Sequence, residues 1–305
     1  MGLVATRIEM MLKARDDDKI DFGRTLTLGR QKVWVSRRQY RRLENRYAIT
    51  GVDSGSIDFK NRIYADQFLR DNFDIKKLSV LDYSGYENSD IIHDMNRSIP
   101  KIHEQKYDVV IDGGTLEHIF NFPTAISNCM NMVKRGGSIF VFSMANNHCG
   151  HGFYQFAPEL FFRIFEPANG FQIKSVVLVE HPYPGAELSV RTKCYSVKDP
   201  SMLGRRGSIS SKSPLGIMVH AVKTEHKKIF QRSPLQSDYS TSWDEENIQT
   251  DSHISGTQKD LTKHRILPII KSLLPFRAKN MITGLNQLYK YSLKNNGDMF
   301  AKWPG

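Results

Sequence analysis

The chain has 305 residues, of which 40% are hydrophobic and 25% are charged, as in ordinary soluble globular proteins that bury a sizeable core. Its 43 lysines and arginines exceed its 32 aspartates and glutamates by 11, which suits an anionic partner but does not bear on the fold. Three separated cysteines, Cys129, Cys149 and Cys194, argue against a disulfide framework and a cysteine-based zinc site. No apolar run approaches the ~18 residues of a membrane helix, and residues 1–19 lack the apolar stretch of a secretory signal. We therefore expect a cytoplasmic protein.

The first predicted elements precede the main sheet. Residues 1–21 are expected to form an N-terminal helix that ends in a charged run at 16–19. The stretch "RTLTLGRQ" (24–31) predicts a short strand followed by a glycine turn. Helical spacing of apolar residues at 36–46 and 60–73 predicts two further helices.

Strand patterns become frequent after residue 77. Apolar runs predict strands at 78–84, 90–94, 107–112, 138–145, 171–181 and 215–223. Two helices are predicted among them, one opening at Pro123 and closing before Gly136, the other at 158–165. Short, continuously apolar strands that alternate with helices predict an α/β fold with a doubly wound, mostly parallel sheet over residues 22–225.

The last eighty residues differ in character. Residues 226–260 are polar and weakly periodic, so they predict a linker of a composition that also favours disorder. Residues 261–305 carry eight lysines and arginines against one acid, Asp298, and predict a basic helical tail. It could bind an anionic membrane surface or a partner, although packing on the domain with a solvated basic face is the simpler interpretation.

Small or polar groups follow five of the predicted strands, where parallel sheets bind their ligands. A carboxylate such as Asp82 can accept hydrogen bonds from both hydroxyls of a ribose, and Asp94 with Met95 can meet a heterocycle. Each group has a structural alternative, such as a cap, an Asx-turn or a tight loop. Their joint placement nevertheless predicts a nucleoside-type ligand. The groups are Gly29, Asp82, Asp94, Asp112–Gly114 and Asn146–Asn147.

Three motifs carry a family resemblance over about residues 22–225. They are "YDVVIDGGTLEHI" (107–119), "MVKRGGSIFVF" (132–142) and "GHGFYQFAPELFFRIFEPANGF" (150–171). The sequence resembles class I S-adenosylmethionine-dependent methyltransferases, and in particular methyltransferase-like proteins of bacterial surface-polysaccharide biosynthesis. The resemblance implies a Rossmann-like methyltransferase fold with S-adenosylmethionine as cofactor.

The resemblance also implies roles for the residues at the strand ends. Asp82, with Tyr83 beside it, would bind the ribose diol, and Asp94 with Met95 the adenine. Gly29 would face the methionine part, and Asp112, Gly113 and Gly114 would line the sulfonium side.

The first loop departs from the family pattern, because Thr27–Gln31 holds one glycine and no acid. The first two strands are also about 50 residues apart, roughly twice the usual separation. This spacing leaves two alternatives open: an insertion between the strands, or a misassigned first strand.

Methyl transfer needs a group that accepts a proton from the acceptor, and histidine is best suited near neutrality. His151 and His118 are the predicted catalytic residues, although His118 could equally hold its loop in place together with Glu117. The polar, aromatic stretch 146–155 suits a sugar-like acceptor. A metal site at His148 and His151 lacks a clear third ligand, so we expect none. The predicted substrate-binding residues are Asn146, Asn147, His148, Tyr154 and Gln155.

The leading hypothesis is a methyltransferase that acts on oxygen or nitrogen of a small-molecule or glycan-linked acceptor. A methyltransferase-like module that binds S-adenosylmethionine without catalysis is the second, because the first loop is degenerate. An RNA methyltransferase is the third, suggested by the net charge of +11 and by "SRRQYRRLENR" (36–46). However, no RNA-binding module is apparent, so a nucleic-acid partner is not expected. A nicotinamide-dependent dehydrogenase is the weakest, since no G-x-G-x-x-G opens a helix. The acceptor and the oligomeric state stay open.

Overall fold

The computed structural model describes residues 2–50, 63–183, 185–203, 209, 211–237, 281, 284–286, 288–293 and 295–304. The chain divides into two compact units: Met1–Val197 with Ser211–Pro234 and Ala301–Gly305, and Lys198–Ser210 with Leu235–Phe300. Every predicted site residue lies in the first unit. The predicted linker beyond residue 237 and the predicted tail up to residue 280 fall outside the described residues.

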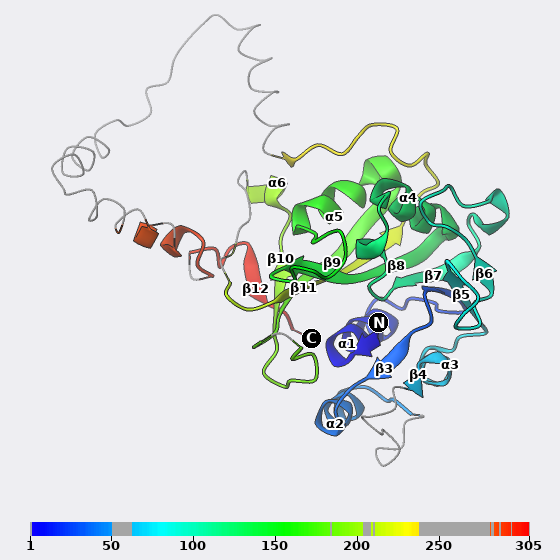
Figure 1. Ribbon diagram of the computed structural model, residues 1–305, viewed down its shortest axis with the longest axis horizontal. Coiled ribbons are helices and arrows are strands. Elements are labelled where there is room, and N and C mark those ends of the chain that lie inside the picture. Colours follow the sequence, from blue (N-terminus) through cyan, green and yellow to red (C-terminus); the bar gives the residue numbers. More distant parts are fainter. Residues whose placement is uncertain are drawn as a thin grey trace, which may run out of the picture. The chain divides into compact units, whose positions relative to one another are not determined.

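A large mixed sheet forms the centre of the first unit (Figure 1). Within the described residues it has nine strands in the order β12-β10-β9-β11-β8-β7-β2-β5-β6. The strands are β2 (Arg24–Leu28), β5 (Lys77–Asp82), β6 (Ile91–Ile92), β7 (Tyr107–Asp112), β8 (Val133–Asn146), β9 (Phe171–Glu180), β10 (Lys193–Val197), β11 (Leu215–Lys223) and β12 (Phe300–Lys302).

The predicted strands are confirmed, and so is the assignment of the first. β2 lies parallel between β5 and β7, with Leu26 opposite both Ser79 and Val110. The pairs β5–β6 and β7–β8 are also parallel, but β11 runs antiparallel to both β8 and β9. The sheet is therefore parallel in the half that carries the predicted cofactor residues and antiparallel in the other half.

The chain reverses its direction across the sheet next to β2. It proceeds from β2 outward to β5 and β6, and then returns to β7 on the other side of β2. In open α/β sheets such a switch point leaves a crevice outside the carboxyl ends of the two strands, where ligands bind. The fold thus places the expected site at the ends of β2 and β7.

An insertion explains the long spacing between the first two parallel strands. After β2 the chain forms β3 (Lys32–Trp34), α2 (Arg37–Arg46), β4 (Ile63–Tyr64) and α3 (Asp66–Phe73) before it enters β5. β3 pairs with β4 and with the N-terminal β1 (Gly2–Val4) in a separate small sheet. The prediction of a helix from residue 60 was wrong at its start, because Ile63 and Tyr64 pair with β3 as a strand.

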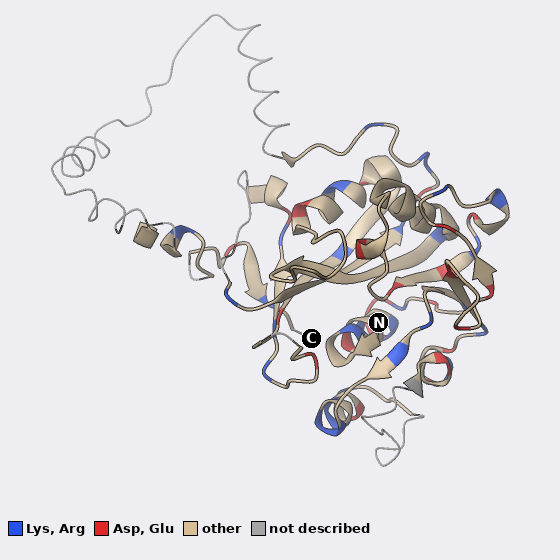
Figure 2. Cartoon of the chain, in the orientation of Figure 1, with Lys and Arg blue, Asp and Glu red and all other residues tan. Residues whose placement is uncertain are grey.

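The arginine-rich stretch forms a capped helix with a solvated face. Ser36 accepts from the Gln39 backbone while the Gln39 side chain returns to the Ser36 N–H, which is a capping box. Gln39, Tyr40 and Leu43 face inward, and Figure 2 shows the blue of arginines along α2. Most arginines of this run therefore lie on the outer face of α2, while Arg46 pairs with Glu9 of α1.

Helices cover both faces of the sheet (Figure 1). α4 (Phe122–Met132) and α5 (Pro158–Ile164) lie on one face, and α1 (Ala5–Asp16) and α3 lie on the other. α4 starts with Pro123 in its first turn, as predicted, and ends at Met132, so that Gly136 falls in a bulged start of β8. Other short helices among the described residues are α6 (Pro200–Leu203), η1 (Lys101–His103), η2 (Leu116–His118) and η3 (Pro167–Asn169). No helix among the described residues is long and apolar enough to cross a membrane.

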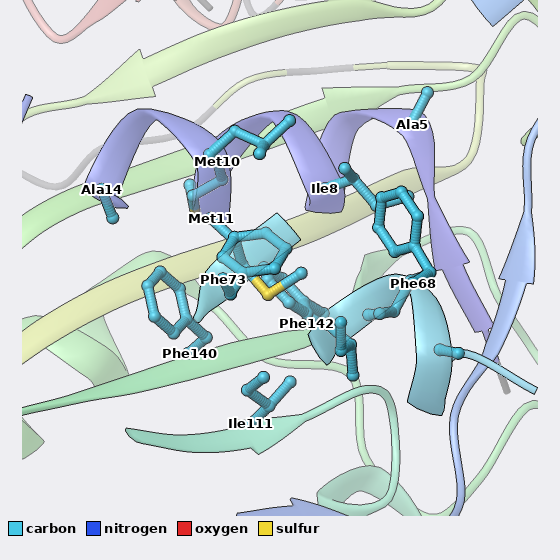
Figure 3. Close-up of a cluster of buried hydrophobic side chains, with 14 of the residues drawn as sticks. Ala5, Ile8, Met10, Met11, Ala14, Phe68, Phe73, Ile111, Phe140 and Phe142 are labelled. Carbon is cyan, nitrogen blue, oxygen red and sulfur yellow. The ribbon is translucent and has the colours of Figure 1, made fainter. Parts of the chain in front are cut away.

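The predicted N-terminal helix is shorter than residues 1–21 and belongs to the core. Residues 2–4 are strand β1, and α1 ends at Asp16. Its Ile8, Met11 and Leu12 are at most 1% exposed, and Figure 3 shows α1 lying over Phe73 and the phenylalanines of β8. Because burial of such side chains contributes about 1.5–3 kcal/mol each, α1 is an integral part of the first unit.

Acid is expected to weaken this fold through His220 of β11. Its buried ring stacks on Phe140 at 4.5 Å, and Nε2 meets Ser138 Oγ at 3.1 Å. Burial lowers the pKa of His220 from 6.5 to about 3, although Asp18 Oδ2 lies 3.7 Å from Nδ1. The unfolded chain therefore binds the proton first, so stability present above pH 6.5 is lost as the pH falls toward 3.

At pH 5 the loss attributable to His220 is about 2 kcal/mol. Urea unfolding of the wild type and of His220→Gln at pH 7 and pH 5 measures it. We expect the free energy of unfolding to fall from pH 7 to pH 5 by about 2 kcal/mol less in the variant than in the wild type. Equal decreases would show that His220 does not carry the acid sensitivity.

Candidate functional site

Three strand ends meet around Gly29. This residue follows β2 with a φ of +67°, and its N–H donates to the Leu81 carbonyl at 2.8 Å. A Cβ at Gly29 would lie 3.7 Å from both Asp82 Oδ2 and Thr115 Oγ1. The positive φ favours glycine, so the single glycine of this loop brings the ends of β2, β5 and β7 together.

The predicted ribose and adenine residues follow β5 and β6, the last two strands of the sheet order on this side. Asp82 is half-buried at the end of β5, and Tyr83 is 74% exposed. Asp94 follows β6, where its Oδ1 accepts from the backbone and side-chain nitrogens of Asn96 at 3.0 and 2.8 Å. These hydrogen bonds lower the pKa of Asp94, and its other oxygen lies 3.7 Å from Arg97 Nε. Asp94 thus forms an Asx-turn.

Gly113 allows close approach of a protein side chain. A Cβ there would lie 2.0 Å from Gln31 Oε1. Gln31 is 2% exposed, and its Nε2 donates to the carbonyls of Leu28 and Gly29 at 2.8 and 3.1 Å. The Gln31 amide thus lies over Gly113, and the predicted place of Gly113 on the sulfonium side stays a prediction.

Asp112 holds the loop that follows β7. Its Oδ1 accepts from the N–H groups of Gly114, Thr115 and Leu116 at 3.2, 2.7 and 3.3 Å. Its Oδ2 is buried and has no hydrogen-bond partner among the described residues. Burial, reinforced by the nearby Glu117 carboxylate, raises the pKa of Asp112 to about 8. Asp112 therefore retains its proton at neutral pH.

A cavity of about 220 Å³ adjoins this loop, at the carboxyl ends of β7, β8 and β9 and the start of β11. The backbones of Gly113 and Gly114 form part of its wall. Its ionisable and hydroxyl-bearing lining residues include Arg7, Glu117, Ser143, His151, His181 and Glu187. This polar cavity lies next to the strand ends around Gly29, since the loop after β7 contributes to both.

Glu117 is the most buried acid of the cavity, with 0% exposure. Its Oε2 accepts from Ser143 Oγ at 2.9 Å, and its Oε1 lies 3.6 Å from His151 Nε2. The η2 turn directs His118 outward, although its ring centroid stays 5.1 Å from that of His151. The structure thus pairs Glu117 with His151, a residue 34 positions away, and His118 lies beside that pair.

The segment after β8 packs directly on η2. A Cβ at Gly152 would lie 2.7 Å from the Glu117 carbonyl oxygen. That oxygen accepts from the N–H groups of Phe153 and Tyr154 at 2.7 and 3.2 Å. These contacts fix the position of His151 relative to Glu117.

Arg7 of α1 reaches the same cavity. Its Nη1 donates to the carbonyls of Gly2 and Gly113 at 3.0 and 2.9 Å. Arg7 keeps some accessible surface because it borders the cavity, yet burial lowers its pKa, against the opposing effect of Glu117, Asp112 and Glu187. Among the described residues that line the cavity, Arg7 is the only lysine or arginine.

The five predicted substrate-binding residues are absent from the described cavity lining. Three of them stabilise loops: Asn147 Nδ2 donates to the carbonyls of Ser211 and Ser213, Tyr154 Oη donates to the Phe120 carbonyl, and Gln155 Oε1 accepts from the His148 N–H. Asn146 is exposed at the end of β8, while burial lowers the pKa of His148. Their role in substrate binding stays a prediction.

Sequence reasoning missed Arg7, His181 and Glu187. His181 directly follows β9, so the strand-end argument used for the other strands would have included it. Arg7 interrupts the apolar pattern of α1, which was a signal that the helix meets a polar site. Glu187 lies in an irregular segment between β9 and β10 and gave no signal.

The comparison with solved structures found weak matches to methyltransferases. No protein-family model matches the sequence, and no curated protein does. A Bacillus halodurans C-125 protein assigned as a methyltransferase matches with a TM-score of 0.39 and 9% identity, covering 73% of this chain and 100% of that one. A second structure is a 1,6-didemethyltoxoflavin-N1-methyltransferase from Burkholderia thailandensis with bound 1,6-didemethyltoxoflavin and S-adenosylhomocysteine. It matches with a TM-score of 0.36 and 11% identity, covering 72% of this chain and 79% of that one.

A third structure is an S-adenosylmethionine-dependent methyltransferase from Thermotoga maritima, with a TM-score of 0.34 and 14% identity, covering 72% of this chain and 91% of that one. Similarities this weak do not assign an activity, a cofactor or an acceptor to this chain. The function is therefore argued from its own residues.

Proposed function

We propose that this protein is an S-adenosylmethionine-dependent methyltransferase that acts on a small-molecule or glycan-linked acceptor in the cytoplasm. One observation carries the proposal: at the switch point of the sheet, the strand ends that carry Gly29 and Asp82 meet the loop after β7, which also lines a polar cavity bordered by Glu117 and His151. Methyl transfer needs two such neighbouring sites, one for the sulfonium donor and one for the acceptor. The motifs that resemble class I methyltransferases lie on these same strand ends.

The strand ends around Gly29 fit the cofactor by the chemistry of their residues. The half-buried Asp82 would accept hydrogen bonds from the ribose hydroxyls, as an acid at this strand end does in nucleotide-binding sheets. The heterocycle would lie toward β6, near Met95, and the methionine part would pass Gly29 toward Gly114. Since Gly114 also lines the cavity, the sulfonium methyl would then face the acceptor.

The acceptor would occupy the cavity, where Glu117 and His151 activate its nucleophilic oxygen or nitrogen. In-line displacement from a sulfonium gains much of its rate from positioning. The cavity supplies several fixed polar groups for this purpose, and Ser143 orients the Glu117 carboxylate. A volume of about 220 Å³ suits one small polar group, such as a single sugar ring, more than a large planar system.

Asp82→Ala tests the cofactor site. We expect it to weaken binding of S-adenosylhomocysteine at least about 100-fold, because both ribose hydroxyls would lose their acceptor. Calorimetric titration of the full chain measures this affinity. The matched control is Asp71→Ala, which removes an exposed carboxylate from α3 and should bind like the wild type.

If neither the wild type nor Asp71→Ala binds S-adenosylhomocysteine or S-adenosylmethionine, the proposed function is wrong. If both bind but no acceptor is methylated in a broad screen, the chain is a binding module without catalysis, as the degenerate first loop would permit. Methylation of RNA in the same screen would favour the third hypothesis, to which the exposed arginines of α2 would contribute.

A further inference from the structure

The structure assigns a divalent metal site to Glu117, His118 and His151. Candidate ligand atoms of these three residues all lie within 4.8 Å of one another. They come from two segments that backbone hydrogen bonds hold together, since the Glu117 carbonyl accepts from the N–H groups of Phe153 and Tyr154. Two imidazoles and a carboxylate are ligands that zinc and other first-row divalent ions prefer, whereas magnesium and calcium prefer oxygen alone.

The spacing of Glu117 and His151 fits two ligands of one ion better than a hydrogen-bonded pair. A carboxylate that orients a histidine base lies about 2.6–3.2 Å from it, but Glu117 Oε1 and His151 Nε2 are 3.6 Å apart. Two ligands bound at about 2.05 Å are separated by this distance when the angle at the ion is about 120°. His118 is exposed, so rotation of its side chain can complete the set.

The ligand atoms are also without hydrogen bonds. Glu117 Oε1 and His151 Nε2 are both buried atoms with no hydrogen-bond partner in the described part of the chain. A buried polar atom without a hydrogen bond or a cation to compensate it is costly, and the Glu117 side chain is 0% exposed. A metal ion would satisfy both atoms at once.

The surroundings of the site match those of a bound cation. Ser143 Oγ donates to Glu117 Oε2 at 2.9 Å, which leaves Oε1 free and fixes the carboxylate, as outer hydrogen bonds do in metal sites. Arg7 faces three carboxyl groups, those of Glu117, Asp112 and Glu187. The described cavity lining holds two glutamates, Glu117 and Glu187, but only one lysine or arginine, Arg7.

A site of this kind would define how the acceptor is activated, an assignment that rests on the proposed function. Glu117 and His151 border the cavity, so an open position on the ion would face an acceptor hydroxyl. Bound there, the hydroxyl would lose its proton to water more readily. Its oxygen would then form the new bond to the methyl carbon as the carbon–sulfur bond of the sulfonium breaks, which leaves S-adenosylhomocysteine as a neutral thioether. His151 would thus be a ligand instead of the predicted base.

Zinc binding by the full chain tests this site. The protein is first stripped with a chelator, and Zn²⁺ is then titrated at pH 7 in competition with a chromophoric chelator. We expect one Zn²⁺ per chain, and an affinity at least about 100-fold lower in Glu117→Gln and His151→Ala. Ser143→Ala, which removes only the outer hydrogen bond, should lower it about 10–100-fold.

Two control variants remove other zinc-binding groups. His226→Ala deletes an exposed histidine outside this loop, and Cys149→Ser deletes the exposed thiol between His148 and His151; both should bind Zn²⁺ as the wild type does. With Co²⁺ in place of zinc, the spectrum should lack a thiolate charge-transfer band. Glu117 is buried, so circular dichroism must show that its variant is folded, whereas the half-exposed His151 offers a second, less disruptive test.

The assignment is overturned if the wild type binds no Zn²⁺, if His151→Ala and folded Glu117→Gln bind as tightly as the wild type, or if Cys149→Ser abolishes binding. Titrating S-adenosylhomocysteine into the stripped protein separates this inference from the proposed function. Zinc binding without cofactor binding would leave the metal site standing and remove its role in methyl transfer. Cofactor binding without zinc binding would remove the metal site and leave the proposed function standing.

Discussion

Replacing Arg7 with alanine is expected to destabilise the first unit by about 3 kcal/mol. The guanidinium donates to the Gly2 and Gly113 carbonyls and thereby joins β1 to the end of β7. Its removal leaves both acceptors without this donor and deprives Glu117 and Glu187 of the nearest positive charge. Hydrogen bonds from charged groups contribute about 1.5–3 kcal/mol each, and loss of one partner from a buried charge cluster costs several kcal/mol.

Urea unfolding at pH 7 measures this effect, with Lys13→Ala as the control on the same helix. Lys13 forms an exposed i,i+4 ion pair with Asp17, which contributes only about 0.3–0.5 kcal/mol. Arg7→Lys keeps the charge, so its loss of unfolding free energy should lie between those of Arg7→Ala and Lys13→Ala. Similar stabilities for Arg7→Ala and Lys13→Ala would refute the role given to Arg7.

Gly152→Ala is expected to disrupt the catalytic side of the site far more than Gly150→Ala. Both glycines have positive φ, +74° and +85°, so alanine at either one is strained by about 1 kcal/mol. A Cβ at Gly150 meets no atom within 4 Å, whereas at Gly152 it lies 2.7 Å from the Glu117 carbonyl oxygen. Because that neighbour is backbone, the segment that carries His151 must move away from Glu117.

The stability lost in Gly150→Ala therefore measures the cost of the backbone conformation alone. The additional loss in Gly152→Ala measures the cost of the contact with the Glu117 carbonyl. We expect Gly152→Ala to lose a further 1–3 kcal/mol or so of stability and to lower Zn²⁺ affinity at least about 10-fold. Urea unfolding and the zinc titration measure the two effects. If both variants keep wild-type zinc affinity, the position of His151 against Glu117 does not depend on this packing.

The parallel half of the sheet was predictable from the sequence because its signals are local. Apolar runs such as "VVI" at 109–111 and the polar residues at their ends mark buried strands and the edge where they stop. Even β2 was placed correctly without the usual glycine-rich loop. The long insertion after it could not be resolved from spacing alone, and Ile63 was assigned to a helix because its strand partner, β3, lies thirty residues earlier.

The constellation at the cavity depends on contacts that local patterns do not encode. Glu117 and His118 are adjacent in sequence, but the η2 turn buries Glu117 and leaves His118 exposed, and both lie near His151, more than thirty positions later. No metal was expected because His148 and His151 lacked a third ligand, but the geometry brings two residues from the loop after β7, Glu117 and His118, to His151. Arg7 was overlooked because residues 1–21 were treated as a segment apart from the domain.

A crystal structure of the full chain with S-adenosylhomocysteine tests the central claim most directly. The account predicts the ribose hydroxyls against the Asp82 carboxylate, the methionine part passing Gly29, and the sulfur directed past Gly114 toward the cavity of Glu117 and His151. Arg30 and Gln31 would border the ligand. Arg30 donates to Asp66 and to the Glu87 carbonyl. A ligand bound away from the ends of β2, β5 and β7, or with its sulfur directed away from the cavity, would contradict it.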